Sequence, residues 1–518
     1  MKLAHVSRAF PILALVLGIA HGWGANAPSS WWLQLASMTL SIAMIFLAAR
    51  NKLVAVSILS ALVFFAASAA TAHAWLFDAL ARVMALGWPL TTIVFGALVL
   101  LLCVLPAIGL ALAGLVFMKS SRAAFAPLVF AAGVPLAEIT TNFLVGFAWT
   151  SAGYAPLGTP LAALYPWIGV YGIAALVSLI AAMTGAAIAA RVEFHTAASE
   201  NNPAPSWGAG PLALAVAAVV VAQLANYRDL TSPASAALHV RLVQPVVDQL
   251  EKFDGLRMRA LAEQLASLAR DSGAQLIVAP ETSFPHLWSA LPSDVADTLL
   301  QAVTSGDQVF LVGMFDVNPE TGGLLNVSSA LRLSSKHSAP QRYTKRRLVP
   351  VAEREAAGLR WLSDALALRY PARTIVDEAP VVFEVGGIGV RTAICLDLAF
   401  GADFSETAGA TGVIVSQSNL AALPGERVRA QFTTIARVRA LEQGKPLLLV
   451  ANDGPTAVID ARGKIRASLP YGKPGALSHE IVPRNGATPY AMLGESLWLA
   501  ALVLGALAIF LRRGPSAG

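Results

Sequence analysis

Long apolar stretches dominate the first 230 residues of the chain, and mostly short ones follow. A helix needs about 20 apolar residues to cross the hydrocarbon core of a membrane. The early stretches reach or approach this length, so they predict a bundle of about seven membrane-spanning helices, and a later stretch predicts one C-terminal span. The predicted spans are residues 10–23, 32–49, 53–77, 89–118, 125–145, 165–190, 211–224 and 497–511.

Two of these spans have unusual features. The first is short, and the Ala-Asn-Ala that follows at residues 25–27 resembles a signal-peptidase site. We expect this span to be retained, because the next apolar run begins almost at once. The fourth span, residues 89–118, is long enough to contain a re-entrant turn near Pro106.

Residues 235–485 have a different pattern, in which short β-rich runs alternate with helical ones. Several runs are continuous in Val, Ile and Leu, as expected for sheets that are covered on both faces. We therefore predict a layered α/β sandwich between a helical bundle at residues 1–230 and a C-terminal span with its tail at 490–518. Strands are predicted at 239–244, 275–279, 308–313, 326–333, 389–394, 412–416, 447–451 and 456–460, and helices at 248–270, 293–303 and 426–443.

Composition supports a membrane protein and indicates its orientation. Only 13% of the 518 residues are charged, against about 25% in an ordinary soluble domain. The net charge of +6 is better explained by cytoplasmic basic residues than by nucleic-acid binding. Basic residues precede the first span and then follow alternate spans, which places residues 235–485 on the outer side and the C-terminus inside. These residues are Lys2, Arg8, Arg50, Lys52, Lys119, Arg122, Arg191, Arg512 and Arg513.

Three polar side chains stand where predicted strands end or basic runs meet apolar ones. Glu281 follows the strand at 275–279, Lys345 lies in a basic run flanked by Tyr343 and Leu348, and Cys395 ends the strand at 389–394. Taken singly, each has an ordinary explanation: a solvated loop carboxylate, a solvated basic face and a small buried thiol. The other cysteine, Cys103, lies inside an apolar run, so a disulfide between the two is implausible.

In this order, the three residues resemble the Glu–Lys–Cys pattern of the nitrilase, or carbon–nitrogen hydrolase, superfamily. Within it, the chain resembles the apolipoprotein N-acyltransferase family. Residues 343–353 read Tyr-Thr-Lys-Arg-Arg-Leu-Val-Pro-Val-Ala-Glu, similar to the family's Tyr-x-Lys-x-x-Leu-Val-Pro-Phe-Gly-Glu. Segments in the membrane part, residues 149–154 and 169–172, are also similar to family segments, and soluble nitrilases have no counterpart to them.

The resemblance implies a nitrilase-type αββα sandwich on a membrane bundle, without metal or cofactor. It implies that Glu281 is the general base, Cys395 the nucleophile, Lys345 the oxyanion stabiliser and Glu353 a supporting carboxylate. The implied reaction moves an acyl chain from a phospholipid onto the cysteine. The chain then passes to the N-terminal amine of a diacylglyceryl-lipoprotein. The implied location is the bacterial inner membrane, with the catalytic domain on the periplasmic face.

The sequence departs from the family around the substrate pocket. Leu396 and Asp397 stand where the family usually has Tyr-Glu, and residues 418–422 also differ from its pattern. The acyl acceptor therefore remains open. A membrane-tethered amidase that resolves the acyl-enzyme with water is an alternative, and a non-catalytic membrane binding protein is a third. The amphipathic stretch at 356–370 is either a core-packing helix or a lipid-facing lid.

The alternating basic residues give a testable topology. A reporter fused after Arg513 should behave as cytoplasmic, and one inserted between Gly322 and Gly323 as external. Alkaline phosphatase and fluorescent-protein fusions at the two positions measure the side directly. Reporters that give the same side at both positions would contradict the topology.

Overall fold

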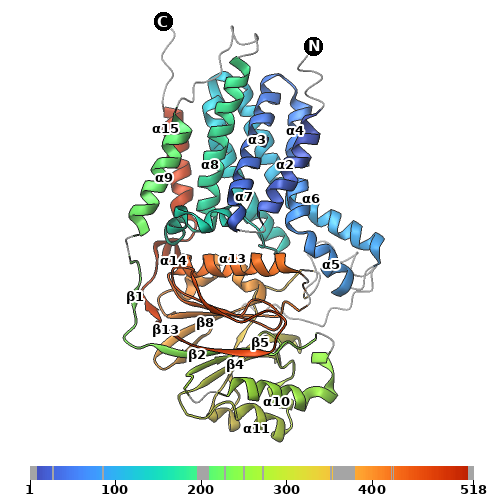
Figure 1. Cartoon of the computed structure of the whole chain (residues 1–518), viewed down its shortest axis with the longest axis vertical. Helices are drawn as coiled ribbons and strands as arrows, with labels where there is room; N and C mark the ends of the chain where they lie inside the picture. The colour runs from blue at the N-terminus through green and yellow to red at the C-terminus, as the bar shows by residue number, and fades with distance from the viewer. Residues whose placement is uncertain are drawn as a thin grey trace.

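The protein has a helical bundle stacked on a domain of two β-sheets, as the computed structural model shows (Figure 1). The structure describes residues 9–25, 28–83, 87–194, 209–226, 229–248, 251–270, 273–350, 353, 380–421, 423 and 425–511. The first helix begins and the last helix ends at the end of the bundle farthest from the sheets (Figure 1). Both ends of the described chain thus lie opposite the sheet domain, as we call the part from β2 to β13.

Each predicted span lies on a helix. The helices of the bundle are α2 (Phe10–Gly24), α3 (Trp31–Arg50), α4 (Val54–Ala72), α6 (Trp88–Met118), α7 (Ala126–Val145), α8 (Tyr165–Phe194), α9 (Gly210–Asn226) and α15 (Ser496–Leu511). Among the described residues, five apolar segments are long enough to cross a membrane, and α2, α9 and α15 are shorter apolar helices. The chain is a membrane protein.

Two details of the third and fourth spans differ from the expectation. The span predicted at 53–77 is wrong at its end, because α4 stops at Ala72 and a separate helix, α5 (Ala74–Val83), follows. Helix α5 is amphipathic: Trp75 and Ala79 are buried, while Asp78 and Arg82 give it a charged face that suits the bundle end rather than the membrane core. The fourth span has no reversal at Pro106, since α6 continues through it. Neighbouring helices allow proline inside such a span.

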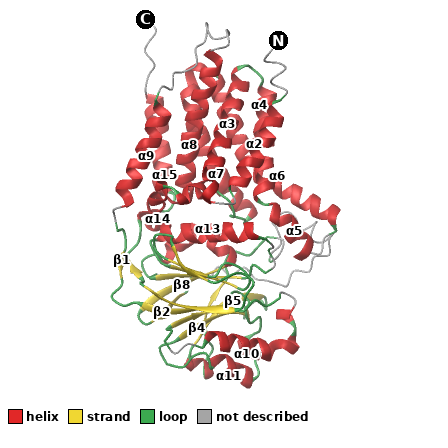
Figure 2. Cartoon of the chain, in the orientation of Figure 1, coloured by secondary structure: helices red, strands yellow, loops and turns green. Residues whose placement is uncertain are grey.

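The sheet domain contains two six-stranded sheets, in the orders β13-β2-β3-β4-β5-β6 and β12-β11-β10-β9-β8-β7. A separate two-stranded ribbon joins β1 to β14. Figure 2 shows the two sheets as adjacent layers. The strands are β1 (Ser232–Pro233), β2 (Leu238–Gln244), β3 (Leu276–Val278), β4 (Val309–Val317), β5 (Leu324–Leu331), β6 (Gln341–Thr344), β7 (Val382–Val385), β8 (Ile388–Ile394), β9 (Val413–Ser418), β10 (Leu447–Ala451), β11 (Ala457–Ile459), β12 (Ile465–Ser468), β13 (Gly475–Ile481) and β14 (Arg484–Asn485).

Helices cover the outer faces of both sheets, which completes the αββα sandwich and confirms the predicted fold class. Helices α10 (Met258–Ala269) and α11 (Ser293–Leu300) pack on the first sheet, and α13 (Glu426–Gln443) packs on the second. The helix predicted at 248–270 begins only at Met258, because Asp254 caps a short 3₁₀ turn before it. Helix α14 (Pro489–Leu493) then leads back to α15.

Helix α13 lies between the second sheet and the bundle, and Gln431 on this helix ties the two parts together (Figure 1). Its Oε1 atom accepts hydrogen bonds from the indole nitrogens of Trp75, at 3.0 Å, and Trp149, at 2.9 Å. Its Nε2 atom donates to the carbonyl oxygen of Ala72 at 3.0 Å. Trp149 also stacks on Phe432. One amide side chain therefore fixes the end of α4, the start of α5 and the chain after α7 against the sheet domain.

A second link involves Gly169 in α8, where φ is +63° and the helix is interrupted. The interruption frees the N–H of Val170, which donates to Glu442 Oε1 at 2.7 Å. A side chain at residue 169 would overlap the ring of Tyr490, because a Cβ atom there would lie 2.1 Å from that ring. Only glycine allows both the left-handed backbone and this close approach. The second link thus fixes α8 to α13 and α14.

Candidate active site

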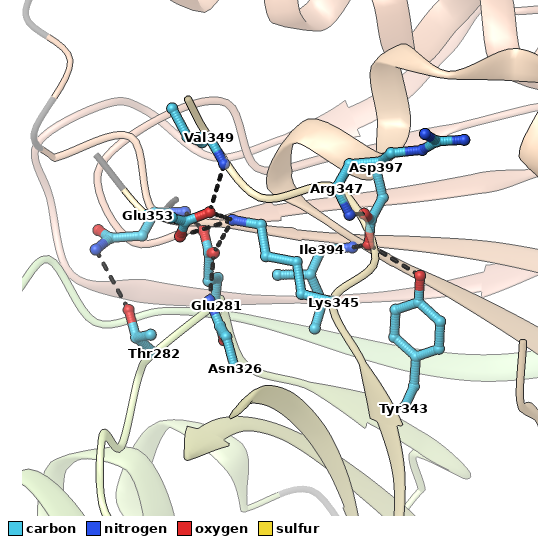
Figure 3. Close-up of polar contacts among 11 residues, drawn as sticks. Glu281, Thr282, Asn326, Tyr343, Lys345, Arg347, Val349, Glu353, Ile394 and Asp397 are labelled. Carbon is cyan, nitrogen blue, oxygen red and sulfur yellow. Dashed lines mark hydrogen bonds and ion pairs between the residues drawn. The ribbon is translucent and has the colours of Figure 1, made fainter. Parts of the chain in front are cut away.

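The three sequence-predicted residues lie where strands of both sheets end. Glu281 follows β3 through Ala279 and Pro280, Lys345 follows β6 directly, and Cys395 follows β8 directly. Strand ends in α/β folds open into loops where reactive groups gather. The structure brings Glu281, Lys345 and Glu353 into contact (Figure 3). The charges of all three act on the Cys395 thiol.

Lys345 is the centre of this cluster. Its Nζ atom lies 2.8 Å from Glu281 Oε1 and 2.9 Å from Glu353 Oε2, and the side chain is 1% exposed. Burial by itself lowers the pKa of Lys345, but the carboxylates of Glu281 and Glu353 outweigh it, so the pKa stands well above its usual value. The two carboxylates therefore favour the charged form of the ammonium group.

Glu281 accepts further hydrogen bonds that orient its carboxylate. Asn326 Nδ2 donates to Oε1 at 2.8 Å, and the backbone N–H of Asn419 donates to Oε2 at 2.9 Å (Figure 3). Strand β4 passes so close behind Glu281 that a Cβ at Gly313 would lie 2.3 Å from the carbonyl oxygen of Pro280. Glycine at 313 is what allows the Glu281 loop to lie against the sheet.

Glu353 receives two kinds of hydrogen bond. Lys345 Nζ donates to it, and so does the backbone N–H of Val349, which lies 2.8 Å from Oε2. The Val349 contact holds the Glu353 carboxylate beside the segment that follows Lys345. The carboxylates of Glu281 and Glu353 therefore contact the same ammonium group, that of Lys345.

Cys395 occupies a strained position at the start of the 3₁₀ turn Cys395–Ala399, with φ at +49°. A non-glycine residue with positive φ costs of the order of 1–3 kcal/mol, and such strain concentrates at functional sites. The side chain is buried. Burial and then the charge of Glu281 raise the pKa of the thiol well above its usual value, and Lys345 opposes them. Burial and Glu281 therefore favour the protonated thiol over the thiolate.

Asp397 holds the Cys395 turn in shape. Its Oδ2 atom accepts hydrogen bonds from the backbone N–H of Ile394, at 3.0 Å, and from the hydroxyl of Tyr343, at 2.9 Å. Its Oδ1 atom accepts from the backbone N–H of Arg347 at 2.7 Å. One buried carboxylate therefore joins the strand end before Cys395 to the strand that carries Lys345 (Figure 3).

The sequence reasoning missed the roles of Asn326 and Asn419 and treated Asp397 only as a departure from a family pattern. Asn326 lies in the middle of a strand-like run and gave no signal. Asn419 falls in the divergent stretch 418–422, and its side chain also approaches Thr282 and Asn452. The amphipathic stretch at 356–370 lies outside the described residues. Within the described part of the chain, no three His, Cys, Asp or Glu side chains are grouped as a metal site would need.

The fold and this cluster define a carbon–nitrogen hydrolase domain joined to membrane helices. The sequence model of the family "Carbon-nitrogen hydrolase" matches residues 240–490, and that of "Apolipoprotein N-acyltransferase N-terminal domain" matches residues 17–183. Together the two matches cover most of the bundle and nearly all of the sheet domain, and they leave α9 and α15 outside.

Relatives match over the length of the chain. The apolipoprotein N-acyltransferase of Verminephrobacter eiseniae is 32% identical over 94% of this chain and 94% of its own length. That of Bordetella bronchiseptica is 30% identical over 70% of this chain and 69% of its own. That of Ralstonia nicotianae is 29% identical over 99% and 95%. The chain belongs to the apolipoprotein N-acyltransferase family.

Among solved structures, similarity extends to Saccharomyces cerevisiae Nit3, a member of the nitrilase superfamily. It is 16% identical and covers 54% of this chain and 96% of its own, with a TM-score of 0.37. An amidase from Nesterenkonia sp. is also 16% identical and covers 52% and 97%, with a TM-score of 0.36.

The Asp397→Asn variant tests how far the Cys395 turn depends on the Asp397 carboxylate. Both oxygens accept hydrogen bonds, so the amide NH₂ must face at least one buried donor. We expect the free energy of unfolding to fall by about 1–3 kcal/mol, seen as a lower midpoint in thermal unfolding of the purified protein.

Asp403→Asn is the matched control. Among the described residues, the Asp403 carboxylate contacts the guanidinium of Arg347; the Asp403 side chain is 11% exposed and that of Arg347 is 42% exposed. Because the guanidinium stays open to solvent, we expect a smaller loss than for Asp397→Asn, of about 1 kcal/mol. Equal shifts in the two variants would show that Asp397 does not hold the turn.

Proposed function

We propose that this protein transfers an acyl chain from a phospholipid to the N-terminal amine of a diacylglyceryl-lipoprotein, through a thioester on Cys395. The observation that carries the proposal is the buried ion network of Lys345 with Glu281 and Glu353, next to a strained cysteine on a turn that packs against the bundle. Membership of the apolipoprotein N-acyltransferase family supports the substrate classes.

In the first step, Glu281 takes the proton of the Cys395 thiol while the sulfur attacks the ester carbonyl carbon of the phospholipid. A tetrahedral intermediate forms, the carbon–oxygen bond breaks, and Glu281 returns the proton to the departing alkoxide. The products of this step are a lysophospholipid and the acyl-enzyme. The raised pKa of Cys395 is the reason that a base is needed.

In the second step, the acceptor amine attacks the thioester carbon, and Glu281 takes a proton from the nitrogen. The carbon–sulfur bond then breaks, the amide is released, and the proton passes from Glu281 to the Cys395 sulfur. The same carboxylate thus acts as base and acid in both halves of the reaction.

Lys345 is proposed to stabilise the oxyanion in both steps. An ammonium group has three N–H donors, and the contacts described for Lys345 are with Glu281 Oε1 and with both carboxylate oxygens of Glu353. In the proposed mechanism, one of the donors shared between the Glu353 oxygens turns to the developing negative charge. Glu353 keeps the ammonium oriented after Glu281 has taken a proton.

The proposed location is the bacterial inner membrane, with the sheet domain on the periplasmic face. The side of the membrane follows from the alternating basic residues. On either side of the membrane, the contact between the bundle end and the Cys395 turn holds the turn beside the bundle, since Leu396 and Leu398 share one buried cluster with Phe147 and Trp149. A lipid ester at the outer membrane surface would then lie close to the thiol.

Variants of the three residues separate their proposed roles. Incubation with phospholipid labelled in its acyl chain, followed by hydroxylamine treatment and mass spectrometry, measures acyl-enzyme on Cys395. Cys395→Ser and Glu281→Gln should abolish the labile acyl group, because the first lacks the thiol and the second lacks the base. Lys345→Met should slow its formation about 10²–10³-fold, as for other oxyanion donors.

Cys103→Ser is the control, since Cys103 lies in α6 and is the other cysteine of the chain. It should form acyl-enzyme at the wild-type rate. Wild-type acylation in Cys395→Ser would exclude the proposed mechanism.

The acceptor can be identified from the fate of the acyl-enzyme. We expect purified acyl-enzyme to persist for minutes in buffer and to discharge when a diacylglyceryl-cysteine peptide is added, giving the N-acyl peptide by mass spectrometry. A peptide without the diacylglyceryl group serves as the control. Rapid release of free fatty acid, whether or not the peptide is present, would establish a hydrolase instead.

A further inference from the structure

An apolar groove of about 400 Å³ lies on the bundle among α3, α8 and α9. Its walls include Leu35, Val177, Ile180 and Ala215, and Val219 at its edge is 38% exposed. Its volume is within the range of about 300–1,000 Å³ that small-molecule sites occupy. Since α3 and α8 are long and apolar enough to cross a membrane and α9 is a shorter apolar helix, lipid rather than water is expected at the mouth of the groove.

A polar chamber of about 100 Å³ adjoins the groove inside the bundle. The two spaces share Gln34, Met38 and Ala152 in their walls. The chamber is also lined by Phe147, whose ring stacks on Trp149 at the junction with the sheet domain. The chamber therefore lies at the bundle end that meets the sheets, where the polar ends of outer-leaflet lipids would lie.

Two buried polar atoms in the chamber wall have no hydrogen-bond partner among the residues that the structure describes. They are Oε1 of Gln34, which is 4% exposed, and Nε2 of His21, which is 7% exposed. The other ring nitrogen of His21 contacts Ser68 Oγ at 2.7 Å, so the ring is held in place. Buried polar atoms are almost always paired, so these two indicate a polar ligand group.

The chamber favours a ligand group that can donate hydrogen bonds. Gln34 offers a carbonyl oxygen, and Glu138 offers carboxyl oxygens that already accept from Ser151 Oγ, at 2.6 Å, and from the N–H of Ala152, at 3.0 Å. A hydroxyl group donates as well as accepts, whereas a phosphodiester only accepts. The chamber is therefore suited to a lipid end that carries hydroxyl groups and no phosphate.

We propose that the groove and the chamber form a second lipid site, which binds one acyl chain of a phosphate-free glycerolipid. The chain lies between α3 and α9 on α8, and the hydroxyl-bearing end reaches Gln34 and His21. Neither space is lined by Glu281, Lys345 or Cys395. The site is thus separate from the candidate active site and does not depend on the proposed acyl transfer.

The test uses the full-length protein in lipid nanodiscs and a monoacylglycerol with a diazirine at the end of its chain. Cross-linked peptides are mapped by mass spectrometry, and acyl transfer is not needed for the readout. Val219→Trp fills the groove, and Val220→Trp is its control, since Val220 is 51% exposed and does not line it. Gln34→Leu removes the polar partner, and Ser37→Ala, one turn along α3, is its control.

We expect labelling of α3, α8 and α9 in the wild type. Val219→Trp and Gln34→Leu should each weaken binding about tenfold, equivalent to about 1.4 kcal/mol, while the controls bind as the wild type does. Unlabelled monoacylglycerol should compete, and lysophosphatidylglycerol of the same chain length should not. Equal labelling of Val219→Trp and Val220→Trp, or equal competition by the two lipids, would overturn the proposal.

Discussion

The Lys345 ammonium group, buried between Glu281 and Glu353, is the interaction on which the rest of the candidate site depends. Removing an ammonium and two carboxylates from water is costly, and it is offset only where the geometry is good and the remaining hydrogen-bonding capacity is filled. Here Asn326, Asn419 and Val349 fill that capacity on the two carboxylates.

The need to fill the hydrogen-bonding capacity of the buried carboxylates explains why the candidate site spans both sheets. Glu281 and Lys345 belong to strand ends of the first sheet, while Asn419 and Cys395 follow strands of the second. Their contacts fix the two sheets in register with each other at one end of the sandwich. The membrane bundle adds a third support, because Trp149 and Phe147 share a buried cluster with the residues after Cys395. The strained turn at Cys395 is therefore supported by the first sheet, the second sheet and the membrane bundle.

The sequence predicted the spans and most central strands because their residues are apolar on every face, and such a pattern is local. It placed the end of the third span wrongly because Trp75, Leu76 and Phe77 continue the apolar run past the break at His73. It also missed β13, which pairs with β2 more than 200 residues earlier and has mostly half-exposed side chains. Edge strands of this kind are defined by their partner, which periodicity does not reveal.

In the candidate site too, the sequence predicted what depends on local pattern and missed what depends on contacts between distant residues. Glu281, Lys345, Glu353 and Cys395 were predicted from residue type, strand ends and a family pattern, but the function of their neighbours depends on distance in space. Asp397 illustrates this point. In sequence it is a departure, since the family usually has glutamate there, yet in the structure its two oxygens accept from three donors, which lie on β8, on β6 and just after β6. A carboxylate one methylene shorter serves this purpose because the Tyr343 hydroxyl and the Arg347 N–H lie close to the turn. The turn at Cys395 therefore requires a negative charge and hydrogen-bond acceptors at fixed positions. It does not require one particular residue to supply them.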